Sequence, residues 1–198
     1  MRRRLSAGLF GLISVFALAG PAFADTTPTP NYRDSGTAEY LSAFATECSQ
    51  STCTDTFVYG ANVDLRGDEP YSYVCIEQYT YSIRGGGRFT SLYGCADTGV
   101  NVASDLSSAS VDATILAESC GRRTCSTEEI SLSLSLTAIG DPIPYSYTHR
   151  DKYGDCVDTY RVAGDAADAE GTLDLDGTTL DAYGQIGSES FAFSSRCR

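Results

Sequence analysis

Apolar and polar residues alternate along two stretches of the chain, one in each half. The clearer stretch places Ile130, Leu132, Leu134, Leu136 and Ala138 between serines and a threonine, and the other repeats Phe57, Tyr59, Ala61, Val63 and Leu65 at every second position. Successive side chains of a strand point to opposite faces, so a period of two predicts a strand with one buried face. No segment after residue 24 combines a helical period with helix caps, and the sequence therefore predicts an all-β protein.

Each of these stretches follows a short cysteine loop. The first loop, at 48–53, reads CSQSTC, and the second, at 120–125, reads CGRRTC 72 positions later. Three further segments recur in the same order: 70–73 with 144–147, both Pro-Tyr-Ser-Tyr, then 93–98 with 153–159, and 105–113 with 174–182. A series of similar segments in one order indicates an internal duplication.

We expect two tandem antiparallel β-sandwich or barrel-like repeats of about 70–90 residues, at 37–108 and 109–198, stabilised by disulfides. A single larger sandwich that includes both halves is the alternative. The spacing of the repeated segments also predicts two insertions. One is a hairpin arm in the first half with Arg84-Gly-Gly-Gly-Arg88 at its tip, and the other is an acidic loop at 164–171.

Residues 1–24 are typical of a secretory signal peptide. Arginines at positions 2–4 precede a short apolar stretch at 5–19, and Ala22-Phe-Ala24 forms a small-x-small cleavage motif. We expect cleavage after residue 24 and a flexible leader at 25–36. The protein is therefore expected to be secreted and extracellular, with no membrane anchor after the signal peptide is removed.

The eight cysteines are expected to form four disulfides, because their number is even and an exported chain meets oxidising conditions. Folding the hairpin arm about its glycines places Cys75 opposite Cys95. A turn near 151–154 would place His149 opposite Cys156, which leaves Cys197 as the partner of Cys156. The predicted pairs are Cys48–Cys53, Cys75–Cys95, Cys120–Cys125 and Cys156–Cys197. The alternative joins Cys95 to Cys156 and Cys75 to Cys197.

The chain is acidic, with a formal net charge of −12. Without the three signal-peptide arginines, 11 basic residues would stand against 26 acidic ones, a net charge of −15. Such a surface repels phosphate backbones, so nucleic acid is not expected as a partner. An extracellular protein or glycan is the expected partner, and the oligomeric state is left open.

The polar residues suggest no catalytic constellation. His149 is the only histidine, Cys156 is expected in a disulfide, and no Gly-x-Ser-x-Gly motif is present. Asp174-Leu-Asp176-Gly177 resembles the start of a calcium loop but lacks the third acid and the closing glutamate, so a solvated acidic loop is favoured. The two Cys-x4-Cys pairs could hold a metal, but export favours disulfides. We expect no metal, no cofactor and no enzyme activity.

Tyrosine is abundant, with 13 residues in a chain that has no tryptophan. Tyr71 with Tyr73, and Tyr79 with Tyr81, are spaced by two, so each pair lies on one face of a strand. Such rings can bind a protein or a glycan, or they can pack against neighbouring strands. We expect a secreted, disulfide-rich binding or structural module, with these tyrosines as possible binding residues.

Arg122 and Arg123 lie within the second cysteine loop. A rigid, disulfide-closed loop that presents arginine is preorganised for a trypsin-like protease. The alternative function is therefore a secreted inhibitor of trypsin-like serine proteases.

Overall fold

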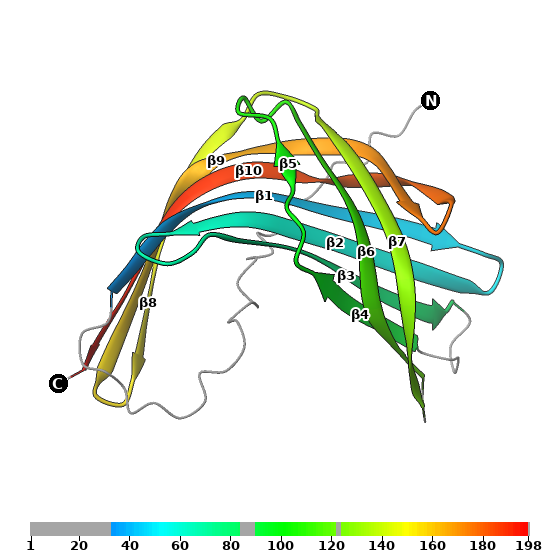
Figure 1. Ribbon diagram of the computed structural model, residues 1–198, viewed down its shortest axis with the longest axis horizontal. Coiled ribbons are helices and arrows are strands. Elements are labelled where there is room, and N and C mark those ends of the chain that lie inside the picture. Colours follow the sequence, from blue (N-terminus) through cyan, green and yellow to red (C-terminus); the bar gives the residue numbers. More distant parts are fainter. Residues whose placement is uncertain (1–32, 84–89, 122–123, 198) are drawn as a thin grey trace.

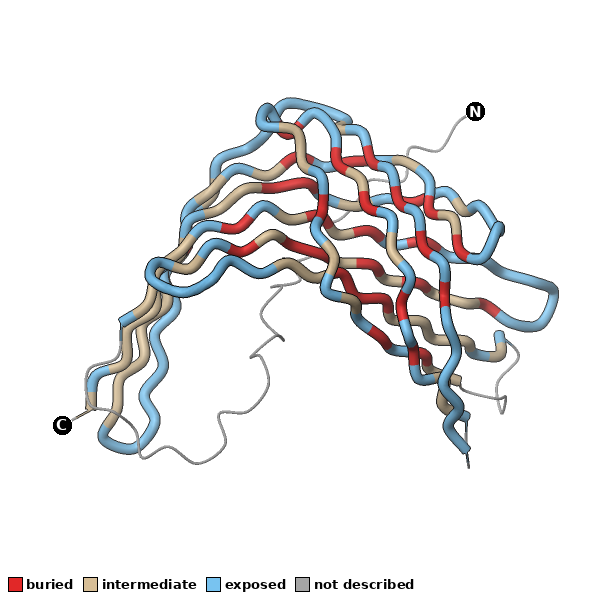
Figure 2. Tube along the Cα trace, viewed as in Figure 1, coloured by how far each residue is buried: buried red, intermediate tan, exposed pale blue. Residues whose placement is uncertain are grey.

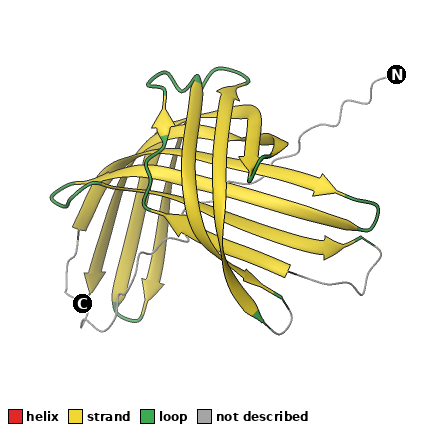
Figure 3. Ribbon diagram, turned by 45° about the vertical axis from the view of Figure 1, so that its right-hand side comes forward, coloured by secondary structure: helices red, strands yellow, loops and turns green. Residues whose placement is uncertain are grey.

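The computed structural model describes residues 33–83, 90–121 and 124–197, and in these ranges the chain forms strands and no helix (Figure 3). The strands are β1 (Arg33–Cys48), β2 (Thr52–Leu65), β3 (Tyr71–Ser82), β4 (Thr90–Ala96), β5 (Asn101–Val102), β6 (Ser108–Cys120), β7 (Cys125–Ala138), β8 (Ile143–Tyr153), β9 (Cys156–Leu175) and β10 (Thr178–Cys197). The prediction of an all-β protein is confirmed.

The strands belong to one antiparallel sheet that closes on itself (Figure 1). Strands β1 to β4 pair in sequence order, β4 pairs with β6, β6 with β7, β7 with β9, β9 with β10, and β10 with β1. The β4–β6 and β10–β1 pairings join the first half of the chain to the second. The strands of 37–108 and 109–198 therefore share one sheet and do not form two separate ones.

An aliphatic core fills the space inside this ring of strands. Leu132, Leu134 and Leu136 of β7 are at most 2% exposed, and the serines between them are exposed. Other strands add Leu41, Val58, Ile76, Ile115, Leu173 and Ile186 to the same cluster. Figure 2 shows the buried residues concentrated in this part of the molecule. The alternation in 130–138 thus identifies the buried face of β7 correctly.

Beyond the ring, the sheet continues as an arm, which consists of β8 with residues 156–166 of β9 and 187–197 of β10 (Figure 1). Strand β8 pairs with the first half of β9, whereas β7 pairs with residues 169–175 of the same strand. Most residues of the arm are exposed or half-buried (Figure 2). The arm therefore lies outside the aliphatic core.

The buried face of the sheet changes where the arm begins. In β1, Leu41 and Ala43 face the aliphatic core, whereas Ala38 is buried and Tyr40 half-buried on the opposite face. Ala38 packs there in a second, smaller cluster with residues of β2. A strand that buries opposite faces at its two ends breaks the period of two.

The alternation in 57–65 therefore identifies the wrong face of β2 as the one that meets the main core. Val58 is 1% exposed and belongs to the aliphatic core, between Phe57 and Tyr59, which are half-buried on the other face. Ala61 and Val63 are buried in the second cluster. The sequence correctly predicts a strand here, but the residues that recur at period two line the opposite side of the sheet.

The structure forms the four predicted disulfides, Cys48–Cys53, Cys75–Cys95, Cys120–Cys125 and Cys156–Cys197. Each joins residues that are directly opposite each other on neighbouring strands. The two short bridges close the β1–β2 and β6–β7 hairpins, and the longest joins the ends of β9 and β10. Four disulfides suggest an oxidising environment of the extracellular type.

The β8–β9 turn differs from the predicted one. Tyr153 pairs with Cys156 across a two-residue turn, and Gly154 in this turn has a φ of 58°. A positive φ is accessible to glycine at little cost, so this residue determines the register of the hairpin. Tyr160, and not Cys156, therefore lies opposite His149.

Residues 164–171, predicted as an acidic loop, lie inside strand β9. Ala167 and Ala169 are each 1% exposed, whereas Asp168 and Glu170 are exposed. Strand β10 pairs along one side of this segment, and β8 and β7 pair along the other. Alanine and glycine bury little apolar surface, so they mark a buried face only weakly in the sequence.

Strand β1 also begins earlier than predicted, at Arg33, within the predicted leader at 25–36. Arg33 pairs with Ser194, so β10 supplies backbone partners that the apolar pattern does not show. The signal peptide at 1–24, the leader up to 32, the hairpin tip at 84–88, and Arg122 with Arg123 lie outside the described residues. The described part of the chain contains no helix that could cross a membrane.

Candidate binding site

Aromatic side chains gather on the face of the sheet opposite the aliphatic core, which we call the tyrosine face. Tyr71, Tyr73, Tyr79 and Tyr81 share it, as their spacing predicts, because the alternate residues Val74 and Ile76 are buried in the core. The cross-strand registers add Tyr40, Phe44, Phe57, Tyr59, Tyr93, Tyr145, Tyr147, Tyr160 and Phe191 to this face. Rings that are distant in the sequence thus lie on one surface.

Small residues form a floor between the two Pro-Tyr-Ser-Tyr segments. One cross-strand row runs from Tyr145 of β8 through Gly164, Glu189, Ala38 and Val63 to Tyr71 of β3. The next row connects Gly187, Tyr40, Ala61 and Tyr73. The tyrosines of the two segments therefore flank the same floor from opposite sides.

Two glycines of this floor make room for rings of the neighbouring strand. Gly187 of β10 pairs with Tyr40 of β1, and a Cβ atom on Gly187 would overlap the Tyr40 ring. Gly36 of β1 pairs with Phe191 of β10, and a Cβ atom there would lie 2.4 Å from the Asp64 carbonyl oxygen and 2.9 Å from Cζ of the Phe191 ring. Each ring thus covers the glycine opposite it, an arrangement that compensates for the missing side chain within a sheet.

Glu189 lies at the centre of this floor and accepts a hydrogen bond from Tyr145. The Tyr145 hydroxyl is 2.6 Å from Oε2 of Glu189, and the hydroxyls of Tyr40 and Tyr145 are 3.3 Å apart. A phenol has one proton to donate. Because Tyr145 donates its proton to Glu189, Tyr40 is the donor to Tyr145. The result is a chain of two hydrogen bonds that runs from β1 to β8 and ends on the carboxylate.

Burial raises the pKa of Glu189 above its ordinary value, and the hydrogen bond from Tyr145 opposes this effect only in part. Burial also raises the pKa of Tyr73 to about 12, and the negative charges of Tyr71 and Glu189 add to the effect. The pKa values of Tyr147 and Tyr160 are raised by burial first and by the charge of Glu189 second. Tyrosines from three strands therefore lie close enough to interact with one carboxylate.

The sheet must curl to bring these groups together, because Tyr73 lies on β3 and Tyr147 on β8, with four strands between them. We call Glu189 with Tyr40, Tyr73, Tyr145, Tyr147 and Tyr160 the Glu189 site. Among the described residues Glu189 has no ion-pair partner, and the ion pair found there joins His149 and Asp151.

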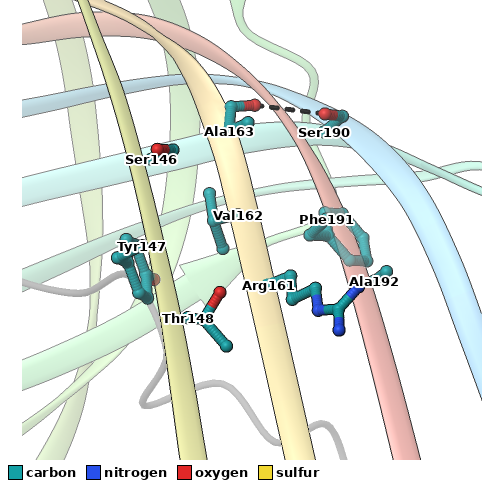
Figure 4. A pocket seen from close by; sticks show the side chains of 9 residues that line it. All are labelled: Ser146, Tyr147, Thr148, Arg161, Val162, Ala163, Ser190, Phe191 and Ala192. Carbon is teal, nitrogen blue, oxygen red and sulfur yellow. Dashed lines mark hydrogen bonds between the residues drawn. The ribbon is translucent and has the colours of Figure 1, made fainter.

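A shallow hollow of about 460 Å³ crosses β8, β9 and β10 in the arm. Figure 4 shows its lining residues, Ser146, Tyr147, Thr148, Arg161, Val162, Ala163, Ser190, Phe191 and Ala192. Tyr147, Val162 and Phe191 are neighbours in one cross-strand row, and the Ser190 hydroxyl donates a 3.1 Å hydrogen bond to the Ala163 carbonyl. The other six lining residues belong to the two adjacent rows, Ser146 with Ala163 and Ser190, and Thr148 with Arg161 and Ala192. Their side chains point to the other face of the sheet, so the hollow lies mainly on the face opposite Glu189.

A second carboxylate on the tyrosine face is also bound by tyrosines. Glu77 accepts hydrogen bonds from Tyr59, at 3.2 Å, and from Tyr79, at 3.0 Å. The Phe57 ring packs against Tyr79, with ring centroids 6.3 Å apart, and against Phe44, at 4.9 Å. Tyr79 thus takes part in packing between strands, which is one of the two roles considered for it.

The other predicted tyrosines differ in exposure. Tyr71 is 48% exposed and Tyr81 38% exposed, whereas Tyr73 is half-buried and packs against the second cluster. The rings of Tyr71 and Tyr73 are stacked, with centroids 6.4 Å apart. Tyr71 therefore lies at the edge of the Glu189 site, stacked on Tyr73, and Tyr81 lies farther along β3.

The remaining chemical candidates have structural roles in the described residues. His149 lies 2.7 Å from Asp151 on an exposed part of β8, and Cys156 is in a disulfide. Asp174 accepts hydrogen bonds from the Gly177 amide and the Thr179 hydroxyl within the β9–β10 turn, both at 2.9 Å. These carboxylate oxygens therefore hold a turn.

One group of possible metal ligands occurs in the described residues, namely Glu118 with Cys120 and Cys125. The two cysteines are bonded to each other, so they offer no thiolate to a metal ion. The arginines of the loop between them lie outside the described residues.

Sequence reasoning missed the centre of the site. Tyr145 and Tyr147 could have been identified from the sequence, because they repeat the Pro-Tyr-Ser-Tyr segment in which Tyr71 and Tyr73 are candidate binding residues. Glu189 lies between two serines and has no such signal.

No family model matches the chain, and no curated protein or solved structure matches it either.

Proposed function

We propose that the protein is a secreted, disulfide-stabilised binding module that contacts its ligand with the tyrosine face around Glu189. The observation that carries this proposal is the arrangement of Tyr71, Tyr73, Tyr145 and Tyr147 around one floor of small residues, with a half-buried carboxylate at its centre. Tyrosine combines an apolar ring with a polar hydroxyl, which suits it to binding surfaces.

The preorganisation of the site supports a binding role. Tyr145 is held by its hydrogen bond to Glu189, and Tyr40 is held by its hydrogen bond to Tyr145, so these rings would lose little side-chain freedom when a ligand binds. A protein or a glycan in the extracellular space is the proposed partner.

Two further features belong to the proposal. Export is supported by the basic and apolar pattern of 1–24 together with the four disulfides. If the chain is expressed with residues 1–24 in place, N-terminal sequencing of the secreted protein should begin at Asp25. Duplication of one β unit is supported by the two cysteine-closed hairpins and by the contribution of both Pro-Tyr-Ser-Tyr segments to one site.

Binding can be tested with the secreted chain and two double variants. Tyr145→Ser with Tyr147→Ser removes rings from the site, and Tyr153→Ser with Tyr183→Ser removes rings that are 85% and 60% exposed on the same face, farther from Glu189 along β8 and β10. Immobilised proteins would be exposed to defined polysaccharides and to purified neutral, acidic and lysine-rich polypeptides. We expect at least one ligand class to lose about tenfold or more in affinity with the first variant only. Equal binding by both variants, or no binding of any ligand, would contradict the proposal.

The alternative proposal is inhibition of trypsin-like proteases by the loop that contains Arg122 and Arg123. In its favour, the Cys120–Cys125 disulfide closes the β6–β7 hairpin, and the Gly121 amide donates a 2.9 Å hydrogen bond to the Thr124 carbonyl. Incubation with trypsin distinguishes the two functions. An inhibitor lowers trypsin activity and stays intact, whereas rapid cleavage after either arginine without inhibition rules this function out.

A further inference from the structure

We propose that the Glu189 site binds an organic ammonium group, either the end of a lysine side chain or a quaternary ammonium. This inference rests on the proposed function, because it assigns the chemistry of the ligand to the same surface. It combines a carboxylate that has no counter-charge among the described residues with the tyrosine rings around it.

The carboxylate is the only charged group of the site. Glu189 is half-buried, and its Oε2 accepts a hydrogen bond from Tyr145. No basic residue forms an ion pair with it among the described residues, and Arg161 points to the opposite face of β9. A half-buried charge without a partner is costly, so a cation that reaches it gains more than it would at an exposed carboxylate.

The walls of the site suit the same ligand. Tyr145 is bonded to Glu189, and Tyr40 is bonded to Tyr145. Tyr73, Tyr147 and Tyr160, from β3, β8 and β9, lie close enough for the charge of Glu189 to raise their pKa values. Aromatic faces attract cations, and tyrosine rings combined with a carboxylate are a recurrent means of holding alkylated ammonium groups. The hydroxyl oxygens add acceptors that a primary ammonium can use.

Other ligand classes fit less well. An anion would be repelled by Glu189 and by the net charge of the chain, which is −12. A neutral sugar could stack on the rings and bond to the hydroxyls, but it would leave the carboxylate without a counter-charge. The distinction between a cation and a neutral ligand is therefore the critical test.

Calorimetric titration of the secreted chain separates these classes without any substitution. The probes are choline, n-butylammonium, and the neutral isostere of choline in which a carbon atom replaces the nitrogen. We expect at least one cation to bind about tenfold or more tightly than the neutral isostere. Preference for choline indicates a quaternary ammonium, and preference for n-butylammonium indicates a lysine-like ligand. Equal binding of the isostere, or no binding of either cation at millimolar concentration, overturns the inference.

A matched pair of variants identifies the carboxylate. Glu189→Gln keeps the size of the side chain and removes its charge, and Glu39→Gln does the same at an exposed position on the opposite face of neighbouring strand β1. We expect a loss of cation affinity of about tenfold or more for Glu189→Gln and no change for Glu39→Gln. Unchanged affinity in the Glu189 variant overturns the inference.

The outcome remains decisive if the Glu189 variant does not fold, because the comparison of choline with its isostere needs only the unsubstituted chain. Failure of the inference can also be told from failure of the proposed function. If the cations do not bind but Tyr145→Ser with Tyr147→Ser still abolishes binding of a polysaccharide or polypeptide, the binding function stands and the ammonium assignment is wrong.

Discussion

The hydroxyl oxygens of Tyr40 and Tyr145 lie 3.3 Å apart, although the two residues are 105 positions apart in the chain. Tyr40 belongs to β1 and Tyr145 to β8, and strands β10 and β9 lie between them. Their side chains meet above these two strands, where the floor consists of Gly164 and Gly187 and where Glu189 accepts the Tyr145 proton. This contact connects the ring of strands to the arm.

Replacement of Tyr145 by phenylalanine tests this connection. Tyr145→Phe keeps the ring but removes both hydrogen bonds, and Glu189 loses its donor in a half-buried position. We expect the free energy of unfolding to fall by about 1.5–3 kcal/mol, as is usual for a hydrogen bond to a charged group. Urea denaturation gives the value. Tyr153→Phe, in the same strand at a position 85% exposed, is the control and should be neutral; equal effects of both variants would show that the contact adds nothing to stability.

Gly187 should not tolerate a side chain. In Gly187→Ala the new methyl group would overlap the Tyr40 ring, so the ring must move and its bond to Tyr145 is lost. We expect a loss of about 1–3 kcal/mol in unfolding free energy, typical of an overpacked site.

Gly140→Ala is the matched control for this substitution, because nothing lies within 4 Å of a Cβ atom at Gly140. The variant should be as stable as the original chain or slightly more stable. Thermal unfolding of both variants gives the comparison. A stable Gly187→Ala protein with an intact ammonium site would mean that Tyr40 does not need this position.

Features set by neighbouring segments of the chain could be predicted from the sequence. The Leu-Ser alternation of β7 reflects one core-facing side along the whole stretch, and Cys75 and Cys95 lie in one hairpin. Cys156 pairs with Cys197 as predicted, although the turn used in that prediction was placed wrongly. The pairing survives because β9 and β10 form their own hairpin, in which these two residues are opposite each other.

Features that depend on distant pairing could not be predicted. The closure of the sheet through β1 and β10 joins the two ends of the described chain, and no local pattern specifies that register. The change of buried face between Tyr40 and Leu41 breaks the period of two that strand prediction uses. The Glu189 site combines both effects, because its residues come from β1, β3, β8, β9 and β10 and lie where the sheet changes its buried face.

The four disulfides should differ in their contribution to stability according to the length of the loop that each one closes. The Cys156–Cys197 bond joins residues 41 positions apart, and the Cys120–Cys125 bond joins residues 5 apart. If a disulfide acts by restricting the unfolded chain, the first is worth about 4 kcal/mol and the second about 2 kcal/mol.

Two double variants test this order by urea denaturation. Cys156→Ser with Cys197→Ser should lower the free energy of unfolding by about 2 kcal/mol more than Cys120→Ser with Cys125→Ser. Both pairs join directly opposed residues at strand ends, so the local geometry is matched. Equal losses, or a larger loss for the short loop, would show that loop length does not determine the contribution of these bonds.

Alkaline pH should unfold the protein through its tyrosines. Burial raises the pKa of Tyr73 from the ordinary value of 10 to about 12, and it also raises the pKa values of Tyr59, Tyr145 and Tyr160. A raised pKa in the folded state means that the fold favours the neutral phenol. The stability from this preference is complete below pH 10 and is lost as the pH rises through about 12.

Near-ultraviolet absorbance of tyrosinate, followed together with circular dichroism, should show a group of tyrosines that ionises only as the sheet unfolds. The same titration in denaturant with reduced disulfides is the control and should show one transition near the ordinary pKa. If all tyrosines ionised near pH 10 while the sheet remained folded, the tyrosine face would be open to solvent and its hydroxyls would not be held around Glu189.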